Sequence, residues 1–342
     1  MILLKTPDFW SRKYSAISIC LLPISVLYYI FYKIFKKSRE YFKKKIKLKS
    51  KVICIGNITI GGSGKTPSCI FLSKMLKNAG YNVVFLTRGY GRSSKGFKEV
   101  LQIDNPNICG DEPILLSRYA RTFVYSSLKD VQNINNIKCD FIIMDDGLQN
   151  SLIHKDFSIL IRDFEYKSGN GLIFPSGPLR CKYKDVLYDM IFNLSYIQEP
   201  RIINESSIIL KLQISGFEKY LHQNLNQDIH QNLHQKNNIF AFCGLARCDK
   251  FFKSLTNSGV ILKNTISFPD HYKYTTKDID LILKIFNPDN NDIIFTTQKD
   301  YVKINYLISN TAIHNSIKIV PIDLEIIELE NISKIINLIS TI

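Results

Sequence analysis

Short apolar runs alternate with helically spaced segments along the first half of the chain. Each run is rich in β-branched or aromatic residues and ends at a turn, which is typical of buried strands. Residues 67–79 are spaced as a helix, and Gly80 is suited to cap it. Strands that alternate with helices in this way predict βαβ units and a mostly parallel sheet. The predicted strands are 51–56 (KVICIG), 82–86 (NVVFL), 140–144 (DFIIM) and 157–161 (FSILI), with another that opens at Phe123 and Val124.

The pattern changes in residues 201–237, where we expect a linker. Residues 206–213 (SSIILKLQ) predict one strand, and the polar near-repeat at 222–237 predicts an expanded loop. Within the repeat, His230 and His234 stand four residues apart, a spacing that could hold a metal on a helix. No clear third ligand accompanies them in the sequence, so we do not predict a metal site there.

A second alternating pattern begins at Asn238. It predicts strands at 238–243, 292–296 and 317–320, a helix at 249–258 and a terminal helix after Glu328. The second half of the chain therefore predicts a further, smaller α/β domain.

Charge is concentrated beside one apolar segment near the N-terminus. The 342 residues carry a formal net charge of +15, and residues 33–51 hold ten lysines and arginines against Glu40 alone. The rest of the chain is only mildly basic, which argues against nucleic acid as a partner. Residues 14–32 are uncharged, and as a helix they would reach roughly 28 Å, close to the thickness of the hydrocarbon core of a bilayer. They could span a membrane, lie in its interface or form a core helix.

The basic run would orient this segment in a membrane. Lysine-rich flanks stay on the cytoplasmic side and attract anionic lipid, so everything after Lys33 would be cytoplasmic. No small-residue cleavage site follows the apolar stretch. We therefore expect a membrane-associated protein, peripheral or single-span, that binds an anionic membrane surface and needs no obligate protein partner.

One motif points to phosphate chemistry. A glycine-rich turn follows the strand at 51–56 and precedes the helix at 67–79, which is the setting of a phosphate-binding loop. Lysine in such a loop reaches the β- and γ-phosphates of a nucleotide, and the threonine after it ligates Mg²⁺. The strict pattern fails at one position, because Thr59 stands where a first glycine is usual. The candidate nucleotide-binding residues are Gly61, Gly62, Ser63, Gly64, Lys65 and Thr66.

Carboxylates supply the other candidates. Asp145 and Asp146 directly follow the apolar strand at 140–144, where a P-loop protein places a carboxylate for Mg²⁺. We therefore expect Thr66, Asp145 and Asp146 to hold the metal. A kinase also needs a base near the acceptor hydroxyl, and residues 110–113 (GDEP) and 268–271 (FPDH) are candidates for it.

These motifs define the expected fold class. We predict an α/β protein with a P-loop-type α/β/α sandwich in its N-terminal domain and a smaller α/β C-terminal domain, joined by the strand-containing linker and preceded by an N-terminal membrane-associated helix. The expected boundaries are 1–50 for the membrane-associating segment, 51–200 for the nucleotide-binding domain, 201–237 for the linker and 238–342 for the C-terminal domain.

Together the motifs resemble those of the tetraacyldisaccharide 4′-kinase family of lipid A biosynthesis. The resemblance runs almost end to end and is weakest at 200–240. The matching pieces are PDFW at 7–10, LLP at 21–23, GNITIGGSGKTP at 56–67, TRGYGR at 87–92, GDEP at 110–113, DDGLQN at 145–150, GNGLIFPSGPLR at 169–180, FPDHYKY at 268–274 and TTQKD at 296–300.

The resemblance implies an activity and a set of residues. It implies MgATP-dependent transfer of the γ-phosphate to the 4′-hydroxyl of a lipid disaccharide, in a cleft between two lobes. It also implies a location at the inner membrane, facing the cytoplasm. It makes Asp111 the acceptor-activating acid and His271 its partner, which suits a carboxylate that takes a proton beside an imidazole that orients it. The residues implied on the substrate side are Asn57, Arg88, Tyr90, Gln149 and Arg180.

Departures from the family pattern leave two alternatives open. Cys181 stands where the family usually has Glu, and Mg²⁺ prefers oxygen ligands. Tyr272 and Gln298 replace a usual His and Glu. The chain could therefore be a degenerate nucleotide-binding module, or a membrane-associated ATPase or GTPase switch. Consumption of ATP that depends on a lipid acceptor distinguishes the kinase from both.

Overall fold

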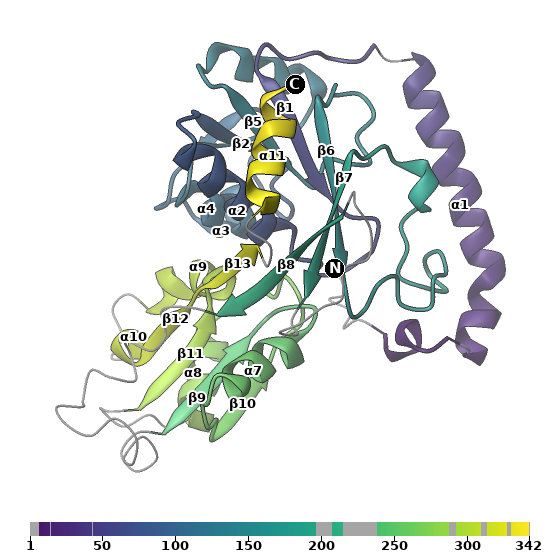
Figure 1. Cartoon of the computed structure of the whole chain (residues 1–342). Coiled ribbons are helices and arrows are strands. Elements are labelled where there is room, and N and C mark those ends of the chain that lie inside the picture. The colour runs from purple at the N-terminus through teal and green to yellow at the C-terminus, as the bar shows by residue number, and fades with distance from the viewer. Residues whose placement is uncertain are drawn as a thin grey trace. The chain divides into compact units, whose positions relative to one another are not determined.

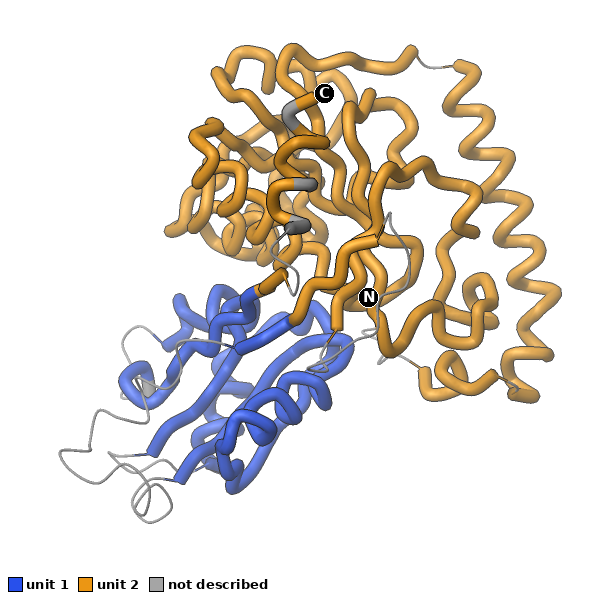
Figure 2. Tube along the Cα trace, viewed as in Figure 1, with its two compact units in different colours: residues 1–5, 212–323 blue, residues 6–211, 324–342 orange. Residues whose placement is uncertain are grey.

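The computed structural model describes residues 7–13, 15–42, 44–195, 207–214, 238–286, 292–308, 313–326 and 330–341. They form two compact units (Figure 2). One unit comprises Thr6–Lys211 and Leu324–Ile342, and the other contains Leu212–Asp323. The domain boundaries expected from the sequence stay a prediction. The predicted loop at 222–237, with His230 and His234, lies outside the described residues.

A nine-stranded sheet forms the centre of the larger unit (Figure 1), in the order β13-β8-β7-β6-β1-β5-β2-β4-β3. The neighbours from β8 to β4 pair in parallel, and β3 pairs antiparallel with β4. The mostly parallel α/β architecture predicted from the sequence is confirmed. The strands are β1 (Lys51–Gly56), β2 (Val83–Thr87), β3 (Lys98–Val100), β4 (Thr122–Val124), β5 (Phe141–Asp145), β6 (Phe157–Asp163), β7 (Met190–Ser195), β8 (Ser207–Ile214) and β13 (Ile322–Ile326).

Helices connect these strands. The predicted helix at 67–79 is confirmed as α2 (Lys65–Asn78), which buries Cys69, Leu72 and Leu76. The predicted terminal helix is α11 (Glu330–Ser340). The other helical elements of this unit are η1 (Asp8–Ser11), α1 (Ala16–Phe42), α3 (Pro106–Cys109), α4 (Asp111–Ser117), α5 (Leu128–Val131), η2 (Gln132–Asn136) and η3 (Tyr183–Asp185).

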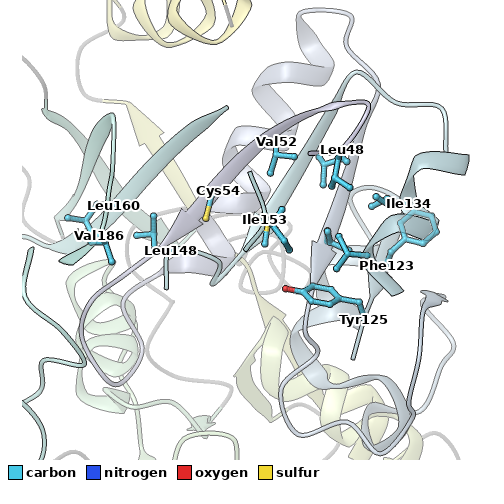
Figure 3. Close-up of a cluster of buried hydrophobic side chains, with 14 of the residues drawn as sticks. Leu48, Val52, Cys54, Phe123, Tyr125, Ile134, Leu148, Ile153, Leu160 and Val186 are labelled. Atoms are coloured by element: carbon cyan, nitrogen blue, oxygen red, sulfur yellow. The ribbon is translucent and has the colours of Figure 1, made fainter. Parts of the chain in front are cut away.

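The core beside β1 explains why the central strands are apolar along their length. Figure 3 shows Val52 and Cys54 of β1 in a cluster that reaches Leu160 on one side and Phe123 on the other. These four side chains are at most 1% exposed. Because a parallel sheet is covered on both faces, its strands carry continuous apolar runs rather than alternating ones.

Helix α1 lies along the segment that connects β6 to β7 (Figure 1), and polar contacts hold it there. Ser25 donates to the Oγ of Ser176 at 2.8 Å, and Tyr29 and Lys33 both reach the buried carboxylate of Asp185 at 2.8 Å. α1 is long and apolar enough to cross a membrane, by length and composition. Large apolar side chains of α1 are nevertheless exposed, among them Ile17, Ile24, Leu27, Phe31, Ile34 and Phe35.

The smaller unit is built on a four-stranded parallel sheet in the order β10-β9-β11-β12. Alternate residues of β9 serve separate cores: Phe240 and Phe242 pack with α8 and α9, whereas Ala241 and Cys243 pack with α7. This alternation makes three layers, with helices on both faces of the sheet. The elements are β9 (Ile239–Cys243), α7 (Cys248–Asn257), β10 (Asn264–Ser267), α8 (Thr276–Phe286), β11 (Ile293–Thr297), α9 (Gln298–Ile308), α10 (Ile313–Ser316) and β12 (Ile317–Val320).

Candidate functional site

The phosphate-binding loop joins β1 to α2 at the carboxyl edge of the large sheet. Gly64 closes the loop with a φ of +79°, and a Cβ there would lie 2.2 Å from Cδ1 of Leu194. The left-handed backbone favours glycine, and any side chain there would also have to displace the Leu194 methyl group. α2 begins at the next residue, Lys65, so the first N–H groups of the helix have no partner within the helix and can bind phosphate oxygens.

Asn57 ties the two ends of this loop together. Its buried Nδ2 donates to the Oγ of Ser63 at 2.6 Å and to the main-chain oxygen of Thr59 at 2.9 Å. The main-chain oxygen of Asn57 in turn accepts from Nε2 of Gln149 at 2.6 Å. Asn57 and Gln149, both implied by the resemblance, therefore meet at the loop and fix its shape.

Two carboxylates at the end of β5 lie beside the start of α2. Oδ2 of Asp145 accepts from the hydroxyl of Thr66 at 3.4 Å. The carboxylate of Asp146 lies 4.0 Å from Nζ of Lys65 and 3.1 Å from Nη1 of Arg180. The structure thus joins Thr66 and Asp145 directly, and Asp146, the residue after Asp145, lies beside Lys65, the residue before Thr66.

The charge of Asp146 is stabilised by three cations. Burial raises the pKa of its carboxyl, but Lys65, Arg180 and Arg88 together outweigh burial and hold the pKa below its usual value. Asp146 is therefore ionised at neutral pH, while 35% of its side chain stays exposed. A hydroxyl and two carboxylates suit Mg²⁺, which is usually held by few protein oxygens together with nucleotide phosphates. Thr66, Asp145 and Asp146 fit that ion.

The segment that carries Arg180 runs beside the start of the loop. The amide of Ile60 donates to the oxygen of Pro178 at 2.7 Å, and the amide of Arg180 donates to the oxygen of Ile58 at 2.8 Å. The carbonyl of Arg180 accepts from the hydroxyl of Tyr28 in α1 at 3.2 Å. α1 therefore contacts the segment that places a cation on Asp146, a link that the sequence did not predict.

Cys181, the residue after Arg180, is a core residue. Its side chain is 0% exposed and packs in the same cluster as Cys54 and Leu148. Burial raises the pKa of the thiol, and hydrogen bonds with Tyr32 and Gln149 only partly oppose it. Cys181 thus stays a neutral thiol, so the described candidates for metal binding remain Thr66, Asp145 and Asp146.

Asp111 begins α4 in the same unit as the loop. Its side chain is 7% exposed, and Oδ1 accepts from the amide of Glu112 at 3.0 Å. The motif around it lies against residues 87–92, because a Cβ on Gly110 would be 3.2 Å from the oxygen of Tyr90. Arg88 and Tyr90, at the end of β2, are both exposed. The motifs at 87–92 and 110–113 therefore meet at the carboxyl edge of the sheet.

His271 belongs to the smaller unit, so its predicted pairing with Asp111 stays a prediction. The residue takes a left-handed backbone with a φ of 54°. Its Nε2 lies 3.2 Å from Nζ of Lys299 and 4.0 Å from the carboxylate of Asp270. Sequence reasoning missed Lys299, although it lies in the motif at 296–300, because nothing in that motif says which residue it contacts.

Comparisons with known proteins agree on one family. The sequence model of "LpxK: Tetraacyldisaccharide-1-P 4'-kinase" matches residues 17–340. The tetraacyldisaccharide 4′-kinase of Rickettsia typhi is 36% identical over 310 residues, which cover 90% of this chain and 92% of that protein. The one from Rickettsia conorii is 34% identical over 317 residues, which cover 91% and 92%.

A solved structure gives the same result for the fold. The crystal structure of LpxK from Aquifex aeolicus in complex with ATP is similar to this structure, with a TM-score of 0.69. It is 25% identical in sequence and covers 94% of this chain and 99% of that one. Since the family model extends over nearly the whole chain, the chain belongs to the LpxK family of tetraacyldisaccharide-1-phosphate 4′-kinases.

Proposed function

We propose that this protein is an ATP-dependent lipid kinase that transfers the γ-phosphate of ATP to the 4′-hydroxyl of a tetraacyldisaccharide 1-phosphate in lipid A biosynthesis. The observation that carries the proposal is the loop at the end of β1. There Lys65 and Thr66 lie beside two carboxylates and Arg180. This constellation suits phosphoryl transfer, where positioning and charge stabilisation do most of the work.

Each residue has a role in this proposal. Lys65 and the loop amides hold the β- and γ-phosphates, and Mg²⁺ held by Thr66, Asp145 and Asp146 would neutralise their charge. The oxygen of the 4′-hydroxyl attacks the γ-phosphorus, and the bond from that phosphorus to ADP breaks. Asp111 takes the proton of the hydroxyl, and His271 orients the Asp111 carboxylate.

Five residues complete the proposed site. Arg88 and Arg180 stabilise the charge on the transferred phosphoryl group. Tyr90 offers the substrate an exposed hydroxyl and aromatic ring just after β2. Asn57 and Gln149 keep the loop in shape through the hydrogen bond between them and the hydrogen bonds of Asn57 to Thr59 and Ser63.

The proposed location is the cytoplasmic face of the inner membrane. α1 presents apolar side chains on its exposed side, and residues 33–51 follow with ten basic residues. Apolar burial combined with attraction to anionic lipid binds such a segment to a membrane surface. The protein would then meet a lipid substrate that stays in the bilayer.

Phosphate transfer is the direct test. The full chain in detergent micelles is incubated with labelled ATP, Mg²⁺ and a disaccharide lipid A precursor phosphorylated at position 1. We expect a labelled lipid with the wild type and none with Lys65→Ala, which removes the phosphate-binding cation. ATP binding without a labelled lipid would contradict the kinase and favour a switch or a degenerate module.

A second variant tests the base. Asp111→Asn should lose turnover while it keeps its affinity for ATP, because the amide cannot take a proton. Turnover within about threefold of the wild type would exclude Asp111 as the base.

A further inference from the structure

The motif at 296–300 (TTQKD) has no role in the proposed mechanism, yet it lies against the loop that carries His271. Nζ of Lys299, in the first turn of α9, is 3.2 Å from Nε2 of His271. The same ammonium is 3.6 Å from Oδ1 of Asp270, whose Oδ1 also accepts from the amide of His271 at 3.0 Å. Lys299 therefore contacts two consecutive residues of the predicted catalytic loop.

We propose that Lys299 is a positioning residue that fixes the tautomer of the His271 imidazole. A lysine ammonium has three N–H donors and no acceptor. Nε2 of His271 must therefore accept the hydrogen bond, which leaves the ring proton on Nδ1. The lysine thus selects one of the two neutral tautomers of the ring.

Asp300 keeps both sides of this contact in place. Its carboxylate is 0% exposed and accepts from the amide of Gly244 at 3.0 Å and from the hydroxyl of Thr297 at 2.7 Å. It also accepts from the hydroxyl of Tyr274 at 3.1 Å, in the loop of His271. One buried carboxylate therefore connects the start of α9, where Lys299 lies, with the loop where His271 lies.

Close packing around Gly244 leaves this arrangement little freedom. A Cβ at Gly244 would lie 3.0 Å from Oδ1 of Asp300, 3.0 Å from the hydroxyl of Tyr274 and 3.1 Å from the oxygen of Pro269. His271 itself has a backbone conformation that side-chain-bearing residues rarely adopt. Such a conformation persists where the surrounding contacts determine it, as they do here.

The choice of tautomer matters for the reaction. An imidazole with its proton on Nδ1 can donate a hydrogen bond from that atom to a carboxylate, whereas the other tautomer presents only a lone pair there. In catalytic sites where an imidazole works with a carboxylate, a wrong tautomer costs most of the rate. The inference rests on the proposed function only for the identity of the reaction, since the hydrogen bond itself is a property of the smaller unit.

Nitrogen NMR of the full chain in detergent tests the tautomer directly. The protein is labelled with ¹⁵N-histidine, and His271→Gln assigns one signal set among the six histidines. We expect a protonated Nδ1 and an unprotonated Nε2 at His271 in the wild type. Lys299→Met should move the proton to Nε2, and Lys299→Arg, which keeps an N–H donor, should leave it on Nδ1. Lys273→Met, an exposed lysine in the same loop, is the matched control and should change nothing.

Activity supplies the second measurement. In the phosphate-transfer assay Lys299→Met should lower kcat at least tenfold with the KM for ATP unchanged, and Lys299→Arg should recover most of the rate. An unchanged tautomer in Lys299→Met, a wild-type ring protonated on Nε2, or a wild-type kcat in Lys299→Met would each overturn the inference. A wild type that fixes the tautomer but transfers no phosphate would instead count against the proposed kinase function.

Discussion

Asp146 and Asp300 each follow a parallel strand, one in each unit, but the two carboxylates differ in solvent exposure and in their partners. Asp146 comes directly after β5, keeps 35% of its side chain exposed and faces Lys65 and Arg180. Asp300 lies just beyond β11, is fully buried, accepts hydrogen bonds from Gly244, Tyr274 and Thr297, and forms an ion pair with Lys303. The Asp146 carboxylate is therefore accessible to a ligand, whereas the protein itself occupies the hydrogen-bonding positions of the Asp300 carboxylate.

The contrast separates two kinds of polar residue that look alike in a sequence. A buried carboxylate must be paired and hydrogen-bonded by the protein itself, because burial of a lone charge is too costly. A carboxylate that is partly exposed and surrounded by cations can exchange those partners for a metal or a phosphate. Removing Asp146 should therefore cost activity, and removing Asp300 should cost stability.

Asp146→Asn should show the largest effect. Loss of the charge removes a proposed metal ligand and leaves Lys65 and Arg180 without their anion. We expect phosphate transfer to fall by about 10²–10³-fold, with the unfolding free energy changed by less than about 1 kcal/mol. Steady-state transfer and denaturant unfolding measure the two quantities. Asp280→Asn, at an exposed position in α8, controls for the change of net charge.

Asp300→Asn should show the reverse. It leaves Lys303, which is 7% exposed, as a buried charge without its 2.7 Å partner. Breaking a buried pair in this way costs about 3–5 kcal/mol of unfolding free energy. Denaturant titration of the full chain, followed by a probe in the smaller unit, measures the loss. An unfolding free energy equal to that of the wild type would mean that the ion pair and the three hydrogen bonds of Asp300 do not stabilise the fold.

Acid should distinguish the two carboxylates as well. Burial raises the pKa of Asp300, but Lys303 and the hydrogen bonds outweigh burial and hold the pKa below its usual value. A lowered folded-state pKa means that the stabilisation is complete above the unfolded-state pKa and is lost as the pH falls through the folded-state pKa. The stability gap between wild type and Asp300→Asn should thus be constant from pH 7 to about pH 5 and shrink below about pH 4.

The corresponding gap for Asp146→Asn should be smaller at every pH, although the pKa of Asp146 is lowered too. Solvent screens a carboxylate that is one-third exposed and reduces what its cations contribute to stability. If the stability gaps of the two variants changed equally with pH, Asp146 would stabilise the fold in the same way as Asp300, contrary to this prediction.

The smallest predicted effect concerns α1. Tyr28→Phe removes the hydroxyl that donates to the carbonyl of Arg180 at 3.2 Å. Arg180 is then held less firmly beside the carboxylate of Asp146. A hydrogen bond of this kind contributes about 0.5–1.5 kcal/mol. We expect a two- to tenfold weaker affinity for MgATP in a binding titration, with the fold intact. Tyr41→Phe, on an exposed ring near the end of α1, should have no effect.

Much of the larger unit could be predicted because its signals are local. β1, β5 and β6 are continuous apolar runs, and the loop at 61–66 lies directly between a strand and a helix. β7 could not be predicted, because the buried Asn193 interrupts its apolar pattern. Oδ1 of Asn193 accepts from Arg162 at 2.7 Å, a contact that exists only after folding. β10 has mostly exposed residues and carries no apolar signal at all.

The candidate site likewise contains residues that local motifs predict and one contact that depends on the fold. The sequence predicts Lys65, Thr66, Asp145 and Asp146 because each pair belongs to a short motif, and residues that are adjacent in such a motif stay adjacent in the fold. Lys299 and His271 are 28 residues apart, and their contact depends on how α9 meets the loop before α8. No spacing rule describes that contact, so the role of the motif at 296–300 could emerge only from the fold.

The anchoring of α1 has a consequence for kinetics. Ser25, Tyr29 and Lys33 commit one side of the helix to the protein, which leaves the apolar side outward. An enzyme bound to a bilayer by that side searches for its substrate in two dimensions. Its rate would then follow the mole fraction of substrate lipid within the surface rather than its bulk concentration, and dilution with inert lipid would slow it even at constant total substrate.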